Sequence, residues 1–204
     1  MSMDGEIAAR PLPLPAFGRM EARDRVRELV DRAVQGDEEA FGGLYDHFSD
    51  AVYRYFYHHV GRAEDAEDLV SRTFLKAWRA LPKFEWRGKP FEAWLFTVAR
   101  TQLLDFLRER RPDRNNAPLE LAFAAVHDDR PGPEAIAIAN LQAVTTRAAL
   151  DNLTFEQREV LVLKFFLGHE NREIAAIMGK REGTVRALQM RALGALRRQL
   201  SDVR

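Results

Sequence analysis

The sequence of 204 residues contains no cysteine, which excludes disulfide bonds and metal sites built from thiolates. This absence fits a reducing cytoplasm, which is the location that we expect for the protein. No apolar run approaches the roughly 20 residues of a membrane span, so we expect no membrane insertion. Net charge is also absent, because 31 acidic residues balance 31 basic ones. A generally basic coat for nucleic acid is therefore excluded, whereas local basic patches are not.

Signatures of catalysis are absent as well. The five histidines are scattered without the spacing of a metal site such as H-E-x-x-H, and no phosphate-binding glycine loop or pair of catalytic carboxylates is found. We therefore expect a protein that is not an enzyme and that needs no metal or cofactor. An enzyme acting on nucleic acid is the least favoured of the possible functions.

No segment alternates apolar and polar residues as a half-buried strand does, so the sequence predicts an all-α protein. A stretch rich in proline, asparagine and aspartate, which is typical of a linker, separates two helix-rich segments. The N-terminal segment has acidic residues and prolines where a secretory signal has a basic start and an apolar core. We predict a flexible extension at 1–22, a helical domain at 23–111, a flexible linker at 112–134 and a second helical domain at 135–204.

Apolar residues recur every three or four positions in three runs of the first domain, as on one face of a helix. Asp37 is a candidate N-cap for the first of these helices. The second is expected to end at Leu81, before Pro82, because proline cannot continue a helix. The third is expected to start near Pro90 and to end in a basic run before Pro112, which suits the helix dipole.

Three helices are also predicted in the second domain. Thr154 would cap the first, which Gly168 ends. Asn171 would cap a short second helix, Gly179 would break it, and the third would cover residues 182–200.

The last two of these helices have the pattern of a helix-turn-helix. Ala175 is small enough for close packing, Gly179 can adopt the left-handed turn, and Val185 can fix the second helix. Residues 180–204 carry seven basic residues against two acidic ones, which indicates binding to phosphate rather than only a solvated face. The side chains expected to face DNA are Arg181, Thr184, Arg186, Gln189 and Arg191.

Two features of the first domain are not explained by a helix-turn-helix. Residues 64–68 are strongly acidic at the start of a helix, although the helix dipole alone would account for them. Residues 84–100 interleave aromatic and basic residues, as a surface for single-stranded DNA does. Trp94 is favoured as a core residue because of its helical spacing, whereas for Trp86 stacking on bases and packing in the protein are about equally favoured.

These segments together resemble sigma factors of the sigma-70 family. Residues 65–78 resemble the core-binding helix of region 2, and residues 94–111 resemble its promoter-melting helix. Residues 153–161 and 173–186 resemble region 4. Because only these two regions are found, joined by a linker without a folded region 3, the chain is similar to the extracytoplasmic-function (ECF) group.

The resemblance implies a bacterial factor that binds core RNA polymerase at its β′ clamp helices and β flap and directs initiation at specific promoters. It also implies promoter DNA and an anti-sigma factor as partners. The implied polymerase contacts are Asp65, Asp68 and Arg72. The implied contacts to the −10 element are Trp86, Arg87, Lys89, Arg100, Thr101, Arg108, Arg110 and Arg111, and the −35 element would be read by Arg181, Thr184, Arg186, Gln189 and Arg191.

Two positions depart from the family pattern. Thr101 stands where many relatives have an asparagine, so base choice there does not follow by analogy. Residues 187–190 lack an arginine that is often present, and Gln189 is a candidate to read a base in its place.

Two other functions stay open at this point. A transcriptional regulator that binds duplex DNA without polymerase would explain residues 171–200, but not the acidic helix or the aromatic segment. A sigma-like protein that only sequesters polymerase has no feature in the sequence that separates it from an active factor.

Overall fold

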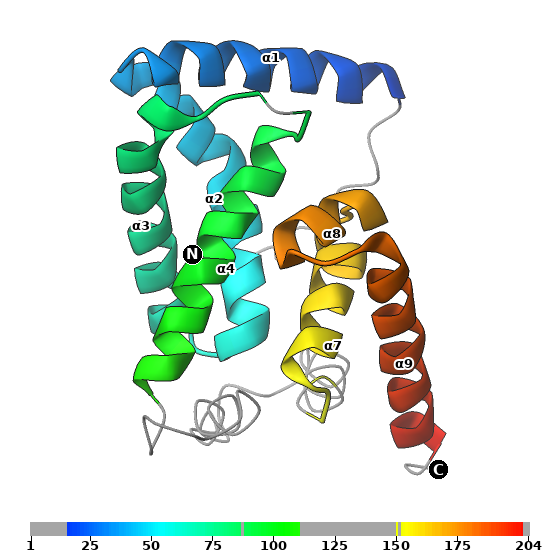
Figure 1. Cartoon of the computed structure of the whole chain (residues 1–204). Helices are drawn as coiled ribbons and strands as arrows, with labels where there is room; N and C mark the ends of the chain where they lie inside the picture. Colours follow the sequence, from blue (N-terminus) through cyan, green and yellow to red (C-terminus); the bar gives the residue numbers. More distant parts are fainter. Residues whose placement is uncertain (1–15, 87, 111–149, 151, 202–204) are drawn as a thin grey trace, which may run out of the picture.

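The computed structural model describes residues 16–86, 88–110, 150 and 152–201, with the side chains of 23–198 in these ranges (Figure 1). All regular structure in this part of the chain is helical, which confirms the predicted all-α class. None of the described helices has the length and apolar character needed to cross a membrane. The predicted linker at 112–134, the segment 135–149 and residues 1–15 lie outside the described residues.

The first domain is a bundle of four α-helices in which α2 packs against both α1 and α3, and α3 packs against α4. Figure 1 shows α1 lying across one end of the other three helices. The fully buried core contains residues such as Leu44, Tyr55, Phe56, Leu69 and Phe96. The elements are α1 (Ala16–Val34), α2 (Glu38–Val60), α3 (Ala63–Ala80), the short 3-10 helix η1 (Leu81–Lys83) and α4 (Phe91–Glu109).

The ends of α2 follow local hydrogen-bonding rules. The side chain of Asp37 accepts a hydrogen bond of 2.9 Å from the backbone N–H of Ala40, which confirms the predicted N-cap. Gly61 ends the helix in the left-handed conformation, at φ 74°.

The start of α1 corrects one expectation. The helix begins at Ala16, so the interpretation of residues 1–22 as a flexible extension is wrong for residues 16–22. Val30 and Ala33, one turn apart, are buried, and Leu29 packs against the same core. This apolar stripe joins α1 to the bundle, and tertiary packing of such a stripe supplies most of a helix's stability.

The second domain consists of α7 (Phe155–Leu161), the π-helical turn η3 (Val162–Phe166), α8 (Asn171–Met178) and α9 (Glu182–Ser201). Thr154 caps α7 as predicted, and it forms a capping box with Gln157. The left-handed conformation of Gly179, at φ 64°, ends α8.

The cap of α8 differs from the prediction. Glu170, not Asn171, is the N-cap residue, and it forms a capping box with Glu173. The side chain of Asn171 instead accepts a hydrogen bond of 2.8 Å from Gln189 of α9. The prediction was wrong because Asn171 is engaged by a helix that is close only in the folded protein.

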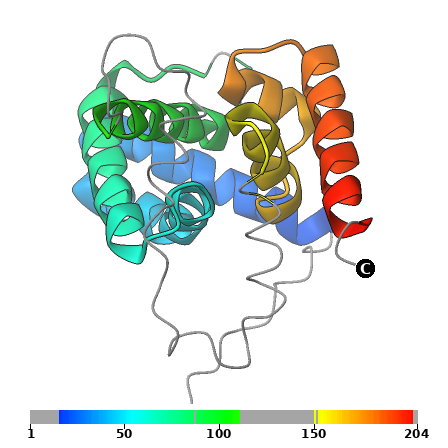
Figure 2. The same cartoon turned by 90° about the horizontal axis from the view of Figure 1, so that it is seen from below.

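The two domains pack directly on each other. Helix α8 lies against α4, and η3 contacts α2. Figure 2 shows the helices of the second domain, coloured yellow to red, beside α4 in green. This arrangement brings part of the candidate DNA-binding surface of α4 next to the second domain.

Candidate nucleic-acid and polymerase interfaces

Helix α9 presents one face to the core of the second domain and the other to solvent. Val185, Leu188 and Ala192 are buried at helical spacing, and Ala175 of α8 is buried with them. With Gly179 in the left-handed turn, this is the helix-turn-helix that the sequence predicted. The packing fixes which side chains of α9 can reach a DNA groove.

Most of the predicted −35 residues are exposed. Arg181 precedes α9, and its backbone carbonyl accepts from the N–H groups of Thr184 and Val185. Arg186 lies 3.5 Å from Glu182 one turn earlier, a weak ion pair that leaves its guanidinium in solvent. Arg191 is also exposed, and its Nε donates a hydrogen bond to the backbone carbonyl of Ala187 in the same helix.

Gln189 and Met190 differ from what the sequence suggested. Gln189 is half-buried, and its amide nitrogen donates to Asn171, so the structure does not present it as a free base reader. Met190 is 77% exposed, the largest value among the exposed large hydrophobic residues of the described structure. Met190 is not among the predicted −35 contacts, although its position one turn after Arg186 was a usable signal.

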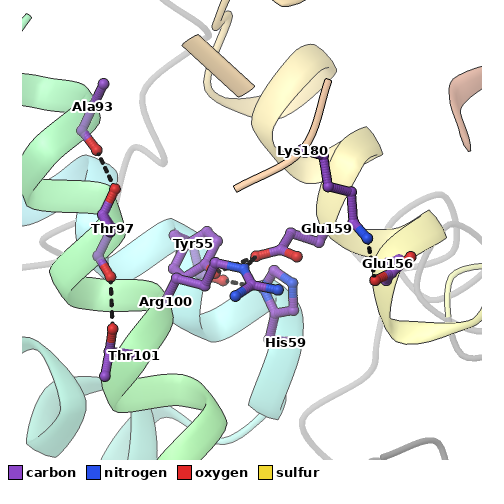
Figure 3. Close-up of polar contacts among 9 residues, drawn as sticks. All are labelled: Tyr55, His59, Ala93, Thr97, Arg100, Thr101, Glu156, Glu159 and Lys180. Carbon is purple, nitrogen blue, oxygen red and sulfur yellow. Dashed lines mark hydrogen bonds and ion pairs between the residues drawn. The ribbon is translucent and has the colours of Figure 1, made fainter. Parts of the chain in front are cut away.

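The candidate −10 residues of α4 have different surroundings. The Nε of Arg100 donates a hydrogen bond of 2.9 Å to Glu159 of α7, and the Arg100 side chain is only 21% exposed. Thr101 is exposed, and its hydroxyl donates to the backbone carbonyl of Thr97 (Figure 3). Arg108 is exposed and pairs with Asp105 of the same helix at 3.1 Å.

The loop between η1 and α4 carries the aromatic candidates. Trp86 is 39% exposed, and its indole N–H donates a hydrogen bond of 2.7 Å to Asp31 of α1. Lys89 is exposed near the end of the loop. Trp94 is half-buried against Phe84 and other rings of the core, as favoured for it. Arg87 and Arg111 lie outside the described residues.

Two residues that were predicted to belong to different interfaces contact each other in the structure. Asp65 of α3 forms an ion pair of 2.7 Å with Arg110, at the end of α4, and a longer one with Arg62. Its side chain is only 13% exposed, and Arg110 also lies over the ring of Phe106. Because both charges are engaged here, this pair has a structural role in the first domain.

Asp68 and Arg72 remain available for a partner. They form an i, i+4 ion pair of 2.7 Å on α3, and about half of each side chain is exposed. Leu75, less than one turn further along, is an exposed apolar residue on the same face of the helix. The three form a mixed surface of the kind that a protein partner can cover.

A polar cluster ties the two domains together (Figure 3). Glu159 is fully buried, and its Oε1 accepts hydrogen bonds from Arg100 at 2.9 Å and from the hydroxyl of Tyr55 at 3.1 Å. Burial raises the pKa of Glu159 above the ordinary carboxyl value, although Arg100 and Tyr55 oppose this change. Burial and the Glu159 charge raise the pKa of Tyr55 well above that of a free phenol.

A second polar contact between the domains involves His169, which is not among the predicted site residues. Its ring is buried and lies 3.5 Å from Glu173 of α8 and 3.8 Å from Glu92 of α4. The hydrogen bond with His169 lowers the pKa of Glu173, whereas burial raises the pKa of Glu92. This contact is not a metal site: within the described residues, no group of three or more His, Cys, Asp or Glu side chains is arranged so that it could hold a metal ion.

Comparison with known proteins identifies both domains. The family model for Sigma-70 region 2 matches residues 44–112, and that for Sigma-70 region 4 matches residues 144–196. The ECF RNA polymerase sigma factor BldN of Streptomyces coelicolor is 39% identical, over 87% of this chain and 67% of the relative. The sigma factor CnrH of Cupriavidus metallidurans is 34% identical, over 89% of this chain and 95% of the relative.

Solved structures agree in fold. The structure of CnrH in complex with the cytosolic domain of CnrY has a TM-score of 0.64 and 29% sequence identity, covering 88% of this chain and 98% of that one. The structure of the sigma factor RpoE in complex with the anti-sigma factor NepR from Bartonella quintana has a TM-score of 0.60 and 26% sequence identity, covering 80% of this chain and 98% of that one. With both regions present in order and relatives covered over most of their length, the chain belongs to the ECF sigma factors of the sigma-70 family.

Proposed function

We propose that this protein binds core RNA polymerase and directs it to specific promoters, with α9 reading the −35 element and α4 with its preceding loop capturing the −10 element. The observation that carries the proposal is the presence of both sigma regions in one chain, each with an exposed set of candidate contacts. A duplex-binding regulator that works without polymerase has no use for the region 2 bundle.

The −35 contact rests on the charge and exposure of α9. Arg186 and Arg191 are exposed, and arginine can bond guanine edges with two hydrogen bonds. Arg181 and Thr184, at the start of the helix, are placed to contact phosphates or base edges of the major groove. Gln189 stays a candidate base contact. To donate its amide N–H to a base, it would have to exchange or share its hydrogen bond with Asn171.

The −10 contact requires a change in the arrangement of the domains. When the two domains are packed together, the guanidinium of Arg100 is paired with the carboxylate of Glu159. A DNA phosphate would therefore have to compete with Glu159 for this cation. We propose that binding to core polymerase separates the domains and frees Arg100. Thr101, Arg108 and Lys89 are already exposed and need no such change.

The polymerase contact is assigned to the surface of α3 formed by Asp68, Arg72 and Leu75, with Asp65 at its edge. This surface would meet the β′ clamp helices, and region 4 would meet the β flap. No covalent chemistry is needed, because melting is driven by the binding energy recovered when unpaired bases stack. The factor therefore acts as a binding protein, not an enzyme, and works in the cytoplasm beside the chromosome.

An anti-sigma factor is the further partner that we propose. Two similar sigma factors were solved in complexes, CnrH with CnrY and RpoE with the anti-sigma factor NepR. A regulator of this kind would act by holding the factor away from polymerase.

Transcription with purified components tests the proposal. The protein and core polymerase are incubated with fragmented genomic DNA, and the transcripts are sequenced. We expect start sites that share −10 and −35 elements and that disappear without the factor. Specific duplex binding by the protein alone, with no transcripts, would favour the regulator instead, and binding to core without transcripts would favour a sequestering role.

A further inference from the structure

Helix α1 lies outside the matched sigma regions, yet it holds the loop that precedes the melting helix. We propose that Asp31 of α1 is a positioning residue of the −10 reader, which fixes Trp86 and thereby the loop residues 84–86 and 88–90. The inference rests on the proposed function, because it assigns this loop to base capture. It adds α1 to the promoter-reading machinery.

The contacts at Trp86 carry the inference. The indole N–H donates a hydrogen bond of 2.7 Å to the Oδ1 of Asp31, and an ionised acceptor makes such a bond stronger. The guanidinium of Arg27 lies 5.4 Å from the centre of the Trp86 ring, within the range of a cation–π interaction. Arg27 and Asp31 are one helical turn apart, so a single face of α1 supplies both contacts.

The loop is anchored near its start and free near its end. The ring of Phe84 contacts those of Trp86, Phe91 and Trp94, which joins the start of the loop to the core. Gly88 turns the chain in the left-handed conformation, at φ 70°, and Lys89 after it is exposed. The Trp86 contact with α1 therefore sets where the exposed turn is presented.

Because Trp86 is only partly buried, its contact with Asp31 matters more for the position of the loop than for the folding of the domain. Trp86 is 39% exposed and outside the core, so burial alone does not fix its ring. Its orientation depends on Asp31, Arg27 and Phe84. A loop that is held in its binding conformation before DNA arrives loses less conformational entropy on capturing a base. The function of Asp31 is this preorganisation, in which Trp86 anchors the loop to α1.

The contact itself is tested in the free, full-length protein. The three tryptophans are labelled with 5-fluorotryptophan, and the Trp86 signal in the 19F NMR spectrum is assigned with Trp86→Phe. We expect Asp31→Ala to shift this signal and leave the other two in place. Asp24→Ala, which removes an exposed carboxylate from the same helix, is the matched control and should move none of them. An unmoved Trp86 signal in Asp31→Ala would overturn the inference.

Its role in promoter opening is tested with core polymerase on a promoter that the wild-type factor recognises. Asp31→Ala should shorten the lifetime of the open complex by roughly threefold to tenfold, the effect of one partly exposed hydrogen bond. Asp31→Asn keeps an oxygen that accepts from the indole and should recover part of the loss. Asp24→Ala should match the wild type, and duplex −35 binding should be unchanged in all variants.

Non-additivity decides whether Asp31 acts through Trp86. Once Trp86→Phe has removed the indole N–H, adding Asp31→Ala should cause little further loss. An equal loss in both backgrounds, or no loss in either, would refute the positioning role. If the wild-type factor opens no promoter, the proposed function fails, whereas the NMR result still decides the contact.

Discussion

The pairing of Arg100 with the buried Glu159 predicts how firmly the two domains hold together. Arg100→Met keeps most of the side chain's volume and removes its charge, which leaves the carboxylate of Glu159 buried without a cation. Breaking a buried ion pair in this way costs about 3–5 kcal/mol, and we expect the lower end because the hydroxyl of Tyr55 still donates to Glu159. A loss of that size shifts the equilibrium between packed and separated domains toward the separated state.

Because the sequence contains no native cysteine, introduced cysteines can be labelled to measure the distance between the two domains. Cysteines introduced at the exposed positions Lys76 of α3 and Arg198 of α9 can carry a donor and an acceptor dye for single-molecule energy transfer. We expect Arg100→Met to move the population toward longer distances. Arg108→Met, which breaks an exposed pair within α4, is the control and should leave the distribution unchanged. A distribution for Arg100→Met equal to that of the wild type would refute the reasoning.

The same experiment has a pH dependence with a fixed sign. The pKa of Glu159 is raised by burial, so the packed state binds its proton more tightly than the separated state does. The stability of packing is therefore greatest below the ordinary carboxyl pKa of about 4.3 and falls as pH rises through the raised value. In Arg100→Met the fall should be steeper, because the cation that offsets burial is gone. Packing that strengthens as pH rises in this range would contradict this assignment.

Three further predictions concern single residues. Asp68→Lys should weaken binding to core polymerase in a pull-down without changing the thermal unfolding temperature. Asp65→Lys should also lower the unfolding temperature, because it breaks two ion pairs. Equal unfolding temperatures for the two variants would contradict the structural role of Asp65. Arg186→Ala should cost about 1–3 kcal/mol at one −35 base pair in a binding assay over single-base variants, and a uniform loss at every position would instead indicate phosphate contact. Thr154→Ala should destabilise the second domain by about 1 kcal/mol in denaturant unfolding, because α7 loses its capping box, and an unchanged midpoint would contradict this.

Short-range features were predictable from the sequence because the interactions that make them lie within a few residues. The caps at Asp37 and Thr154, the turn at Gly179 and the buried Val185 all follow from local geometry and helical spacing. The same locality allowed the helix-turn-helix and the exposed arginines of α9 to be identified. The resemblance to sigma factors depended on these local motifs and their order.

Contacts between distant parts of the chain were not predictable in this way. Asp65 and Arg110 are 45 residues apart, Trp86 and Asp31 are 55 apart, and Arg100 and Glu159 are 59 apart. A single sequence shows which of these side chains are charged or aromatic, but not which ones meet. Helical spacing placed them on helix faces, and only the packing of α1, α4 and α7 in three dimensions decided their partners. Local hydrogen bonding thus determined the helices and the reading surface, whereas tertiary packing decided which of the candidate contacts are free and which are engaged within the protein.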